Sequence, residues 1–162
     1  TATLWQTCRQ PQDYLDLGAD GLQQHIRSIG LYRNKTRSIL GLCEMIRDDF
    51  GGSVPQTREE LQKLPGVGRK SANVILNVVF NQPTLAVDTH IFRVANRVGL
   101  TRQKTPEKTE LELLQKVPEE HLLHAHHYLI LHGRYTCVAR RPKCAQCVVN
   151  RLCNWPQKDD QE

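Results

Sequence analysis

The stretch REELQKLPGVGRKSANVILNVVF, residues 58–80, decides the fold of this 162-residue chain. Its two ends have the apolar spacing of helices, and the LPGVG segment at 64–68 predicts a tight turn between them. Glycine allows positive φ and close approach, so backbone amides at the start of the second helix can point outward and bind phosphate. An ordinary helical hairpin is the alternative, but Arg69 and Lys70 follow at once and favour contacts to a nucleic-acid backbone.

Helical patterning extends over most of the remaining chain. The expected helices cover residues 11–17, 19–27, 32–48, 58–63, 69–80, 88–98, 106–117 and 119–135. Thr57, with Glu60 three residues on, predicts a capping box for the short helix at 58–63. No segment shows a convincing alternating strand pattern. The sequence therefore predicts an all-α protein.

Two helical lobes are expected, because Asn81-Gln82-Pro83-Thr84 interrupts the helical pattern. Residues 1–82 form the lobe with the hairpin, and residues 83–162 form a C-terminal lobe with a cysteine-rich loop. The polar tail from Gln157 onward is expected to be disordered.

Four cysteines near the C-terminus, Cys137, Cys144, Cys147 and Cys153, have the spacing C-x6-C-x2-C-x5-C. Four thiolates so close in sequence are typical of a structural zinc site or of an iron–sulfur cluster. A disulfide framework fits poorly, because the chain has neither a secretory signal nor a cysteine-dense composition.

The loop after Cys137 carries three cations, Arg140, Arg141 and Lys143, and is expected to face something anionic. The whole chain has 22 Lys and Arg against 17 Asp and Glu, which by itself is weak evidence for nucleic-acid binding. It contains no apolar run long enough to span a membrane. Cys8 and Cys43 are expected to pack in the core, the common role of isolated cysteines, and Trp5 is expected to lie in the core or to close a domain.

Lys70 lies in the first turn of its helix, where the helix dipole disfavours an ammonium group. This position favours a neutral amine, which is what a Schiff-base nucleophile requires. A surface lysine that contacts phosphate is an equally good interpretation. Asp88, in Val87-Asp88-Thr89-His90, is explained as a helix N-cap, but a carboxylate beside a cleft would also stabilise the cationic sugar formed when a glycosidic bond breaks.

Histidines gather on the helix expected at 119–135, at positions 121, 124, 126 and 127. The spacing of His121 and His124 is compatible with a metal site, but the surrounding apolar residues favour a structural or solvated role. His90 follows Asp88 closely, and the sequence assigns it no proton-transfer role.

Four motifs agree in order and spacing with one known family. LPGVGRK at 64–70, VDTHIFR at 87–93, HGRYTC at 132–137 and the cysteine spacing resemble the bacterial endonuclease III family, the iron–sulfur DNA glycosylases of the helix-hairpin-helix superfamily. The similarity covers about residues 8 to 155. The family has further helical sequence before this point, so the first lobe is expected to lack its N-terminal part.

The resemblance implies a bifunctional enzyme of base excision repair that removes oxidised pyrimidines and cleaves the abasic strand by β-elimination. It makes Lys70 the nucleophile and Asp88 the catalytic carboxylate, and the presence of the lysine disfavours the monofunctional relatives. It makes the four cysteines ligands of a 4Fe–4S cluster, with DNA in a cleft between the two lobes. The residues expected to contact DNA are Leu64, Pro65, Gly66, Val67, Gly68, Arg69, Arg140, Arg141 and Lys143.

The expected partner is double-stranded DNA with a damaged pyrimidine or an abasic site. The enzyme is expected to be a monomer in the bacterial cytoplasm, associated with the nucleoid and not with a membrane. Two other classes of function are open on the residues alone: a non-catalytic DNA-binding module, in which Lys70 contacts phosphate and Asp88 only caps its helix, and a zinc-stabilised structural domain.

Overall fold

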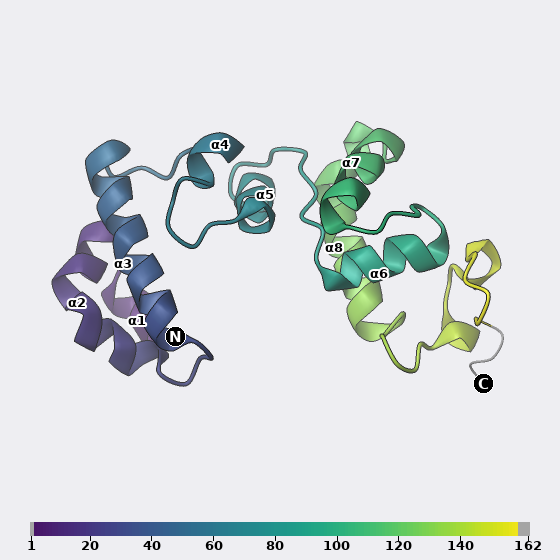
Figure 1. The fold of residues 1–162 in the computed structure, drawn as a ribbon, viewed down its shortest axis with the longest axis horizontal. Coiled ribbons are helices and arrows are strands. Elements are labelled where there is room, and N and C mark those ends of the chain that lie inside the picture. The colour runs from purple at the N-terminus through teal and green to yellow at the C-terminus, as the bar shows by residue number, and fades with distance from the viewer. Residues whose placement is uncertain (1, 159–162) are drawn as a thin grey trace. The chain divides into compact units, whose positions relative to one another are not determined.

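The computed structural model describes residues 2–158, and these contain helices and loops but no strand (Figure 1). The prediction of an all-α protein is confirmed. The chain forms two compact units that divide after Ala72. No described helix combines the length and the apolar character needed to cross a membrane.

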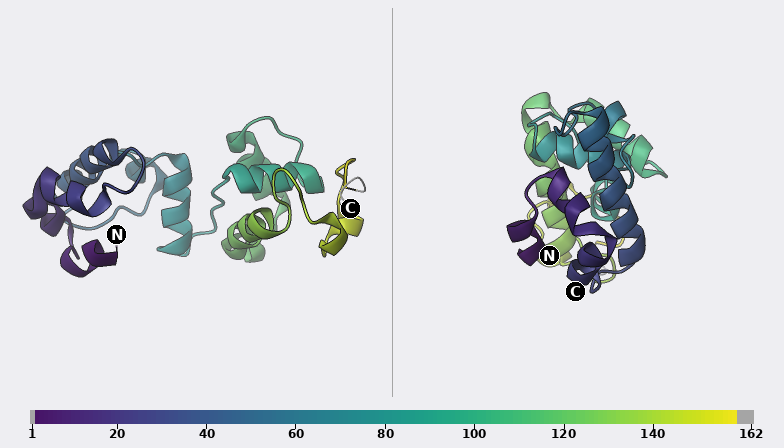
Figure 2. Two further views of the ribbon diagram at one scale, coloured as in Figure 1. Left: turned by 90° about the horizontal axis from the view of Figure 1, so that it is seen from below. Right: turned by 90° about the vertical axis from the view of Figure 1, so that its left-hand side faces the viewer.

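The first unit is built on two long helices. Helix α2 (Pro11–Ile26) lies beside α3 (Tyr32–Asp49), as Figures 1 and 2 show, while α1 (Ala2–Thr7) and α4 (Arg58–Leu61) are short. The two helices expected on either side of Gly18 form one element with a kink, because this glycine has φ 68° and ψ −179°.

Apolar side chains from α1 and α2 make a small core in this unit, formed by Leu4, Cys8, Leu22 and Ile26. Cys8 and Cys43 are both buried, which confirms their expected packing role. Trp5 is 63% exposed, so the expectation that it lies in the core is wrong. Apolar spacing places a residue on a helix face, but its burial depends on whether another element covers that face.

The second unit packs α6 (Thr89–Val98) against α7 (Pro106–Lys116) and α8 (Glu119–Tyr135). Ile91 and Ala95 repeat along one face of α6 and join a core with Leu85, Leu113 and Leu122. After α8 the chain forms two single-turn 3₁₀ helices, η1 (Cys144–Gln146) and η2 (Asn150–Leu152).

Helix α5 (Arg69–Val78) begins in the first unit and ends in the second. The segment after it is tied back to its second half by side-chain hydrogen bonds. Asn73 Nδ2 donates to Leu85 O at 3.1 Å, Asn77 Nδ2 donates to Thr84 O at 3.0 Å, and Thr84 Oγ1 donates to Asn73 O at 2.7 Å. The side-chain nitrogens of buried Asn73 and Asn77 are satisfied in this way, although Asn73 Oδ1 has no partner among the described residues, so the segment that follows α5 is fixed by hydrogen bonds. The two units therefore divide ten residues earlier than the sequence suggested, at 72 rather than 82.

Candidate active site and metal centre

The turn before α5 depends on Gly66. Its φ is +81°, and a Cβ there would come 2.8 Å from Ser38 Cβ on α3. The Val67 amide donates to Leu64 O at 3.0 Å and closes the turn. Leu64 is buried, so its side chain anchors the turn in the first unit. Gly68 has no positive φ, and the conformational argument made for both glycines therefore holds only for Gly66.

Lys70 lies in the first turn of α5, immediately after this hairpin. Its side chain is exposed, and the first turn contains no acidic residue. Helix α4 on the other side of the hairpin is capped by Thr57, but the described hydrogen bonds do not include the bond from the Thr57 amide to the Glu60 side chain that the predicted capping box requires. The Glu60 amide donates to Thr57 Oγ1 at 3.3 Å, and this hydroxyl donates to Glu60 Oε2 at 2.7 Å. The local sequence thus presents an exposed amine at a helix N-terminus.

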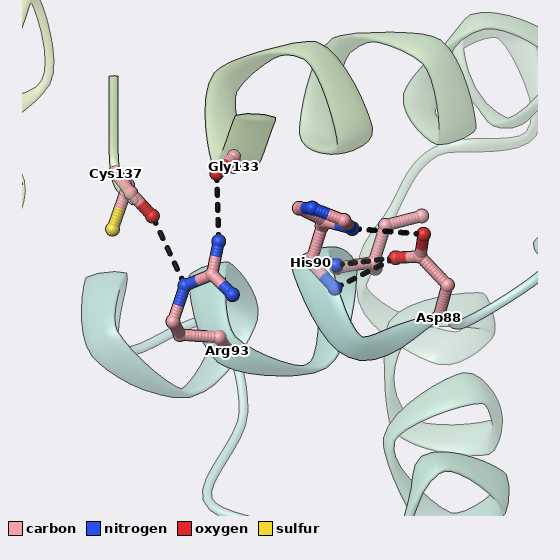
Figure 3. Close-up of polar contacts among 6 residues, drawn as sticks. Asp88, His90, Arg93, Gly133 and Cys137 are labelled. Atoms are coloured by element: carbon pink, nitrogen blue, oxygen red, sulfur yellow. Dashed lines mark hydrogen bonds and ion pairs between the residues drawn. The ribbon is translucent and has the colours of Figure 1, made fainter. Parts of the chain in front are cut away.

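Asp88 caps α6, and it does so with only one of its two oxygens (Figure 3). Oδ1 accepts hydrogen bonds from the amides of His90 at 2.9 Å and Ile91 at 2.8 Å. Oδ2 lies 3.2 Å from His90 Nδ1. Burial alone would raise the pKa of Asp88, but hydrogen bonds from the Ile91 amide and from His90 outweigh it and lower the pKa. The carboxylate is therefore held ionised.

The four cysteines of the C-terminal quartet line one cavity in the second unit. All four are free thiols. Burial raises the pKa of the Cys144 thiol, and the three other cysteines raise it further because they face it. None of the four cysteines forms a disulfide.

The donor set fits an iron–sulfur cluster better than it fits zinc. A single zinc ion binds thiolates at about 2.3 Å and would draw them into tight contact around one point. Within the described part of the chain, no three His, Cys, Asp or Glu side chains are grouped closely enough to hold one ion. Four thiols around a shared cavity suit a larger inorganic core.

Arg97 on α6 binds the cysteine-rich loop, a contact that the sequence analysis missed. Nη1 donates to Val138 O and Nη2 to Ala139 O, each at 2.9 Å, and Nη1 lies 3.8 Å from Cys137 Sγ. One turn earlier, Arg93 donates from Nε to Cys137 O at 3.0 Å and from Nη2 to Gly133 O at 2.6 Å (Figure 3). The only sequence signal was the four-residue spacing of two arginines on one helix.

Two further side chains, those of His132 and Lys158, support the same loop. His132 Nε2 lies 3.7 Å from Cys147 Sγ, and burial lowers the pKa of this histidine. Lys158 Nζ donates to the carbonyls of Asn150 and Cys153, each at 3.1 Å. The tail expected to be disordered from Gln157 is thus ordered at Lys158, and its residues 159–162 lie outside the described residues.

The remaining predicted residues lie at the surface. Arg140, Arg141 and Lys143 are exposed on the loop between the first two cysteines, and the Lys143 amide donates to Thr136 O at 3.0 Å. Of the five histidines on α8, three are exposed, His132 is half-buried and His126 is buried.

Comparison with known proteins decides the family. Residues 1–119 match the model of the HhH-GPD superfamily of base excision DNA repair proteins, and residues 137–153 match the iron–sulfur binding domain of endonuclease III. The chain belongs to the endonuclease III family. It is 51% identical over 155 residues to endonuclease III of Rickettsia felis, which covers 96% of this chain and 73% of that protein. It is 50% identical over 163 residues to endonuclease III of Bacillus subtilis, covering 100% and 74%.

A solved structure of a trapped endonuclease III–DNA covalent intermediate superposes on the chain with a TM-score of 0.91 and 44% identity, covering 98% of this chain and 75% of that one. As an endonuclease III family member, the chain is a DNA glycosylase and abasic-site lyase of base excision repair. The match over residues 137–153 indicates that the chain carries an iron–sulfur cluster.

Proposed function

We propose that this endonuclease III family member removes oxidised pyrimidines from double-stranded DNA, with Lys70 as the nucleophile and Asp88 as the catalytic carboxylate. The observation that carries the proposal is the placement of Lys70. It is an exposed lysine in the first turn of α5, directly after the phosphate-binding hairpin of a family whose solved structures include a trapped covalent complex with DNA.

The reaction begins when the damaged nucleotide leaves the base stack, because C1′ is otherwise inaccessible. The neutral amine of Lys70 attacks C1′, the C1′–N bond breaks, and the base leaves with the bonding electron pair and a proton. The sugar ring opens to give an imine between Lys70 Nζ and C1′. The imine accepts electrons when a C2′ proton is removed, the 3′ phosphate leaves by β-elimination, and water releases Lys70.

Asp88 supports the first of these steps. Its Oδ1 is occupied by the two amides that begin α6, whereas Oδ2 has no backbone donor among the hydrogen bonds of the described residues. A carboxylate held ionised by fixed donors is suited to stabilise the positive charge that develops on the sugar as the base departs. Oδ2 is the oxygen assigned to this role.

We assign the contacts with DNA to two elements. The hairpin from Leu64 to Gly68, with Arg69, offers backbone amides to phosphate, with buried Leu64 fixing the turn. Arg140, Arg141 and Lys143 supply positive charge from the cysteine-rich loop. We assign a 4Fe–4S cluster to Cys137, Cys144, Cys147 and Cys153, and its contribution here is structural, since it shapes the loop that carries these cations.

The proposal distinguishes an enzyme from a non-catalytic DNA-binding module. In a binding module, Lys70 would contact phosphate and Asp88 would only cap α6. The capping role is present in the structure, but it uses one oxygen and leaves the other available. We further propose that the protein acts as a monomer, in the cytoplasm and at the nucleoid.

Borohydride trapping on an oligonucleotide with one oxidised pyrimidine tests the proposal, since only an imine can be reduced to a stable protein–DNA link. The wild type should give the link, and Lys70→Gln should give neither the link nor base release nor strand cleavage. Lys63→Gln is the matched control, because Lys63 is an exposed lysine just before the hairpin. A link that persists in Lys70→Gln would move the nucleophile to another residue.

A further inference from the structure

The two oxygens of Asp88 stand in different environments. Oδ1 is fixed by two backbone amides at 2.9 and 2.8 Å, which belong to the rigid first turn of α6. Oδ2 is approached by a single side chain, His90, with Nδ1 at 3.2 Å (Figure 3). Both oxygens are therefore held against rotation of the carboxylate about its Cβ–Cγ bond. A substitution of His90 would remove the contact to Oδ2 and leave the backbone cap at Oδ1 in place.

This contact determines which ring nitrogen of His90 carries a hydrogen. Oδ2 of an ionised carboxylate can only accept a hydrogen bond, so Nδ1 of His90 must be the donor. The neutral tautomer with hydrogen on Nε2 would point a lone pair at the carboxylate and would be repelled. The side chain of Asp88 is 10% exposed and that of His90 is 33% exposed. The contact is thus only partly shielded from water, and it is stronger than an equivalent contact at the surface.

The backbone of His90 is held in place by α8. A Cβ on Gly133 would come 2.9 Å from His90 Cβ and 3.2 Å from His90 O, so the two helices touch at this point. Gly133 O also accepts the hydrogen bond from Arg93 at 2.6 Å. The first turn of α6 cannot shift toward α8, and the His90 ring therefore starts from a fixed position beside Asp88.

We propose that His90 is a positioning residue for the reaction: its Nδ1–H orients Oδ2 of Asp88, the oxygen that faces the developing charge on the sugar. The inference rests on the proposed role of Asp88. His90 acts through the carboxylate, so its effect falls on the step that needs the carboxylate most. Base release depends on the Asp88 carboxylate to stabilise the charge on the sugar. Cleavage at a pre-formed abasic site depends on it less, because Lys70 can attack the aldehyde form of the sugar without the loss of a base.

Two variants of nearly equal shape separate the hydrogen bond from packing. Asparagine carries Nδ2 the same number of bonds from Cα as histidine Nδ1, so His90→Asn keeps a donor at this place. His90→Leu puts a methyl group there. Single-turnover base release should fall about 10- to 100-fold in His90→Leu, the range expected for one hydrogen bond to a charged group. His90→Asn should recover most of the rate, and cleavage of a pre-formed abasic site should change little in either variant.

The Asp88→Asn background then tells whether His90 works through Asp88. Asparagine still caps α6, so this variant keeps the helix while it removes the charge. His90→Leu should cause no further loss of base release there. An equal loss in both backgrounds would mean that His90 acts on DNA directly, and equal loss in His90→Leu and His90→Asn would mean that its packing matters; either result overturns the inference.

The same set of variants separates this inference from the proposed function. If Asp88→Asn releases the base at the wild-type rate, the role proposed for Asp88 fails and the inference fails with it. If Asp88→Asn is slow while His90→Leu matches the wild type, Asp88 keeps its role and only the inference on His90 is overturned. Cluster absorbance and melting temperature, measured for each variant, show that the comparison is made among folded proteins.

Discussion

The guanidinium of Arg97 lies over the indole ring of Trp155, with its Cζ 4.1 Å from the ring centroid. The same side chain donates to the carbonyls of Val138 and Ala139, each at 2.9 Å. Val138 follows the first cysteine of the quartet, and Trp155 stands just after the last. Arg97 therefore holds both ends of the cysteine-rich loop against α6, with two hydrogen bonds and a cation–π contact.

Replacement of Arg97 by lysine should loosen this loop. Lysine keeps the charge but loses the planar fork that reaches two carbonyls and stacks on the ring. We expect a loss of about 1–3 kcal/mol in the free energy of unfolding, the scale of one hydrogen bond from a charged group. Bleaching of the cluster absorbance in air should be faster than in the wild type.

Arg151→Lys is the matched control, because Arg151 is an exposed arginine on η2 within the same loop. If the cluster absorbance bleaches at the same rate in both variants, the contacts of Arg97 do not stabilise the loop.

Gly133→Ala should destabilise the contact between α6 and α8. The added Cβ would come 2.9 Å from His90 Cβ and 3.0 Å from Val94 Cγ2, and neither helix can yield without disturbing the core. Overpacking of this kind costs about 1–3 kcal/mol, and it outweighs the gain of up to about 1 kcal/mol from the better helix propensity of alanine. Chemical denaturation measures the difference.

Gly30→Ala serves as its control, since a Cβ at Gly30 would meet no atom within 4 Å. A Gly133→Ala variant as stable as the Gly30→Ala variant would show that α8 can shift at this point.

Features that depend on neighbouring residues could be predicted from the sequence. The hairpin, the caps by Thr57 and Asp88 and most helix ends follow from residues within one or two turns of one another. The site contacts that the sequence missed join distant positions: Arg97 reaches Val138 across 41 residues, and Arg93 reaches Cys137 across 44. Helical periodicity shows which face such an arginine occupies but not which loop packs on that face. For the same reason, the sequence did not show that Trp5 would be exposed.

The cationic loop gives a prediction for binding. Replacing Arg140, Arg141 and Lys143 by alanine should weaken the affinity for damaged and undamaged DNA alike, because phosphate contacts carry no base information. Each lost contact should flatten the slope of log K against log salt by about 0.9. Fluorescence anisotropy over a salt series measures both effects.

Cluster absorbance should survive this triple substitution, because none of the three residues is a cysteine ligand. Unchanged binding together with loss of the cluster would show that these cations support the metal centre and do not contact DNA.

The pH dependence of stability should report the environment of Asp88. Its pKa in the folded protein lies below the ordinary value of 3.8 because donors from Ile91 and His90 outweigh the cost of burial. Above that value the residue is ionised in both states, and its contribution to stability is complete. As the pH falls below it, the unfolded chain binds the proton first, and the contribution is lost as the pH passes through the folded-state pKa. Asp88→Asn keeps the cap but does not titrate, so the advantage of the wild type over this variant in free energy of unfolding should be present at about pH 6 and should shrink as the pH falls below 3.8 and through the folded-state pKa. Both proteins carry the same cysteine ligands, so acid loss of the cluster affects them equally and cancels in the difference. An advantage that does not change with pH would mean that the folded structure does not favour the ionised carboxylate.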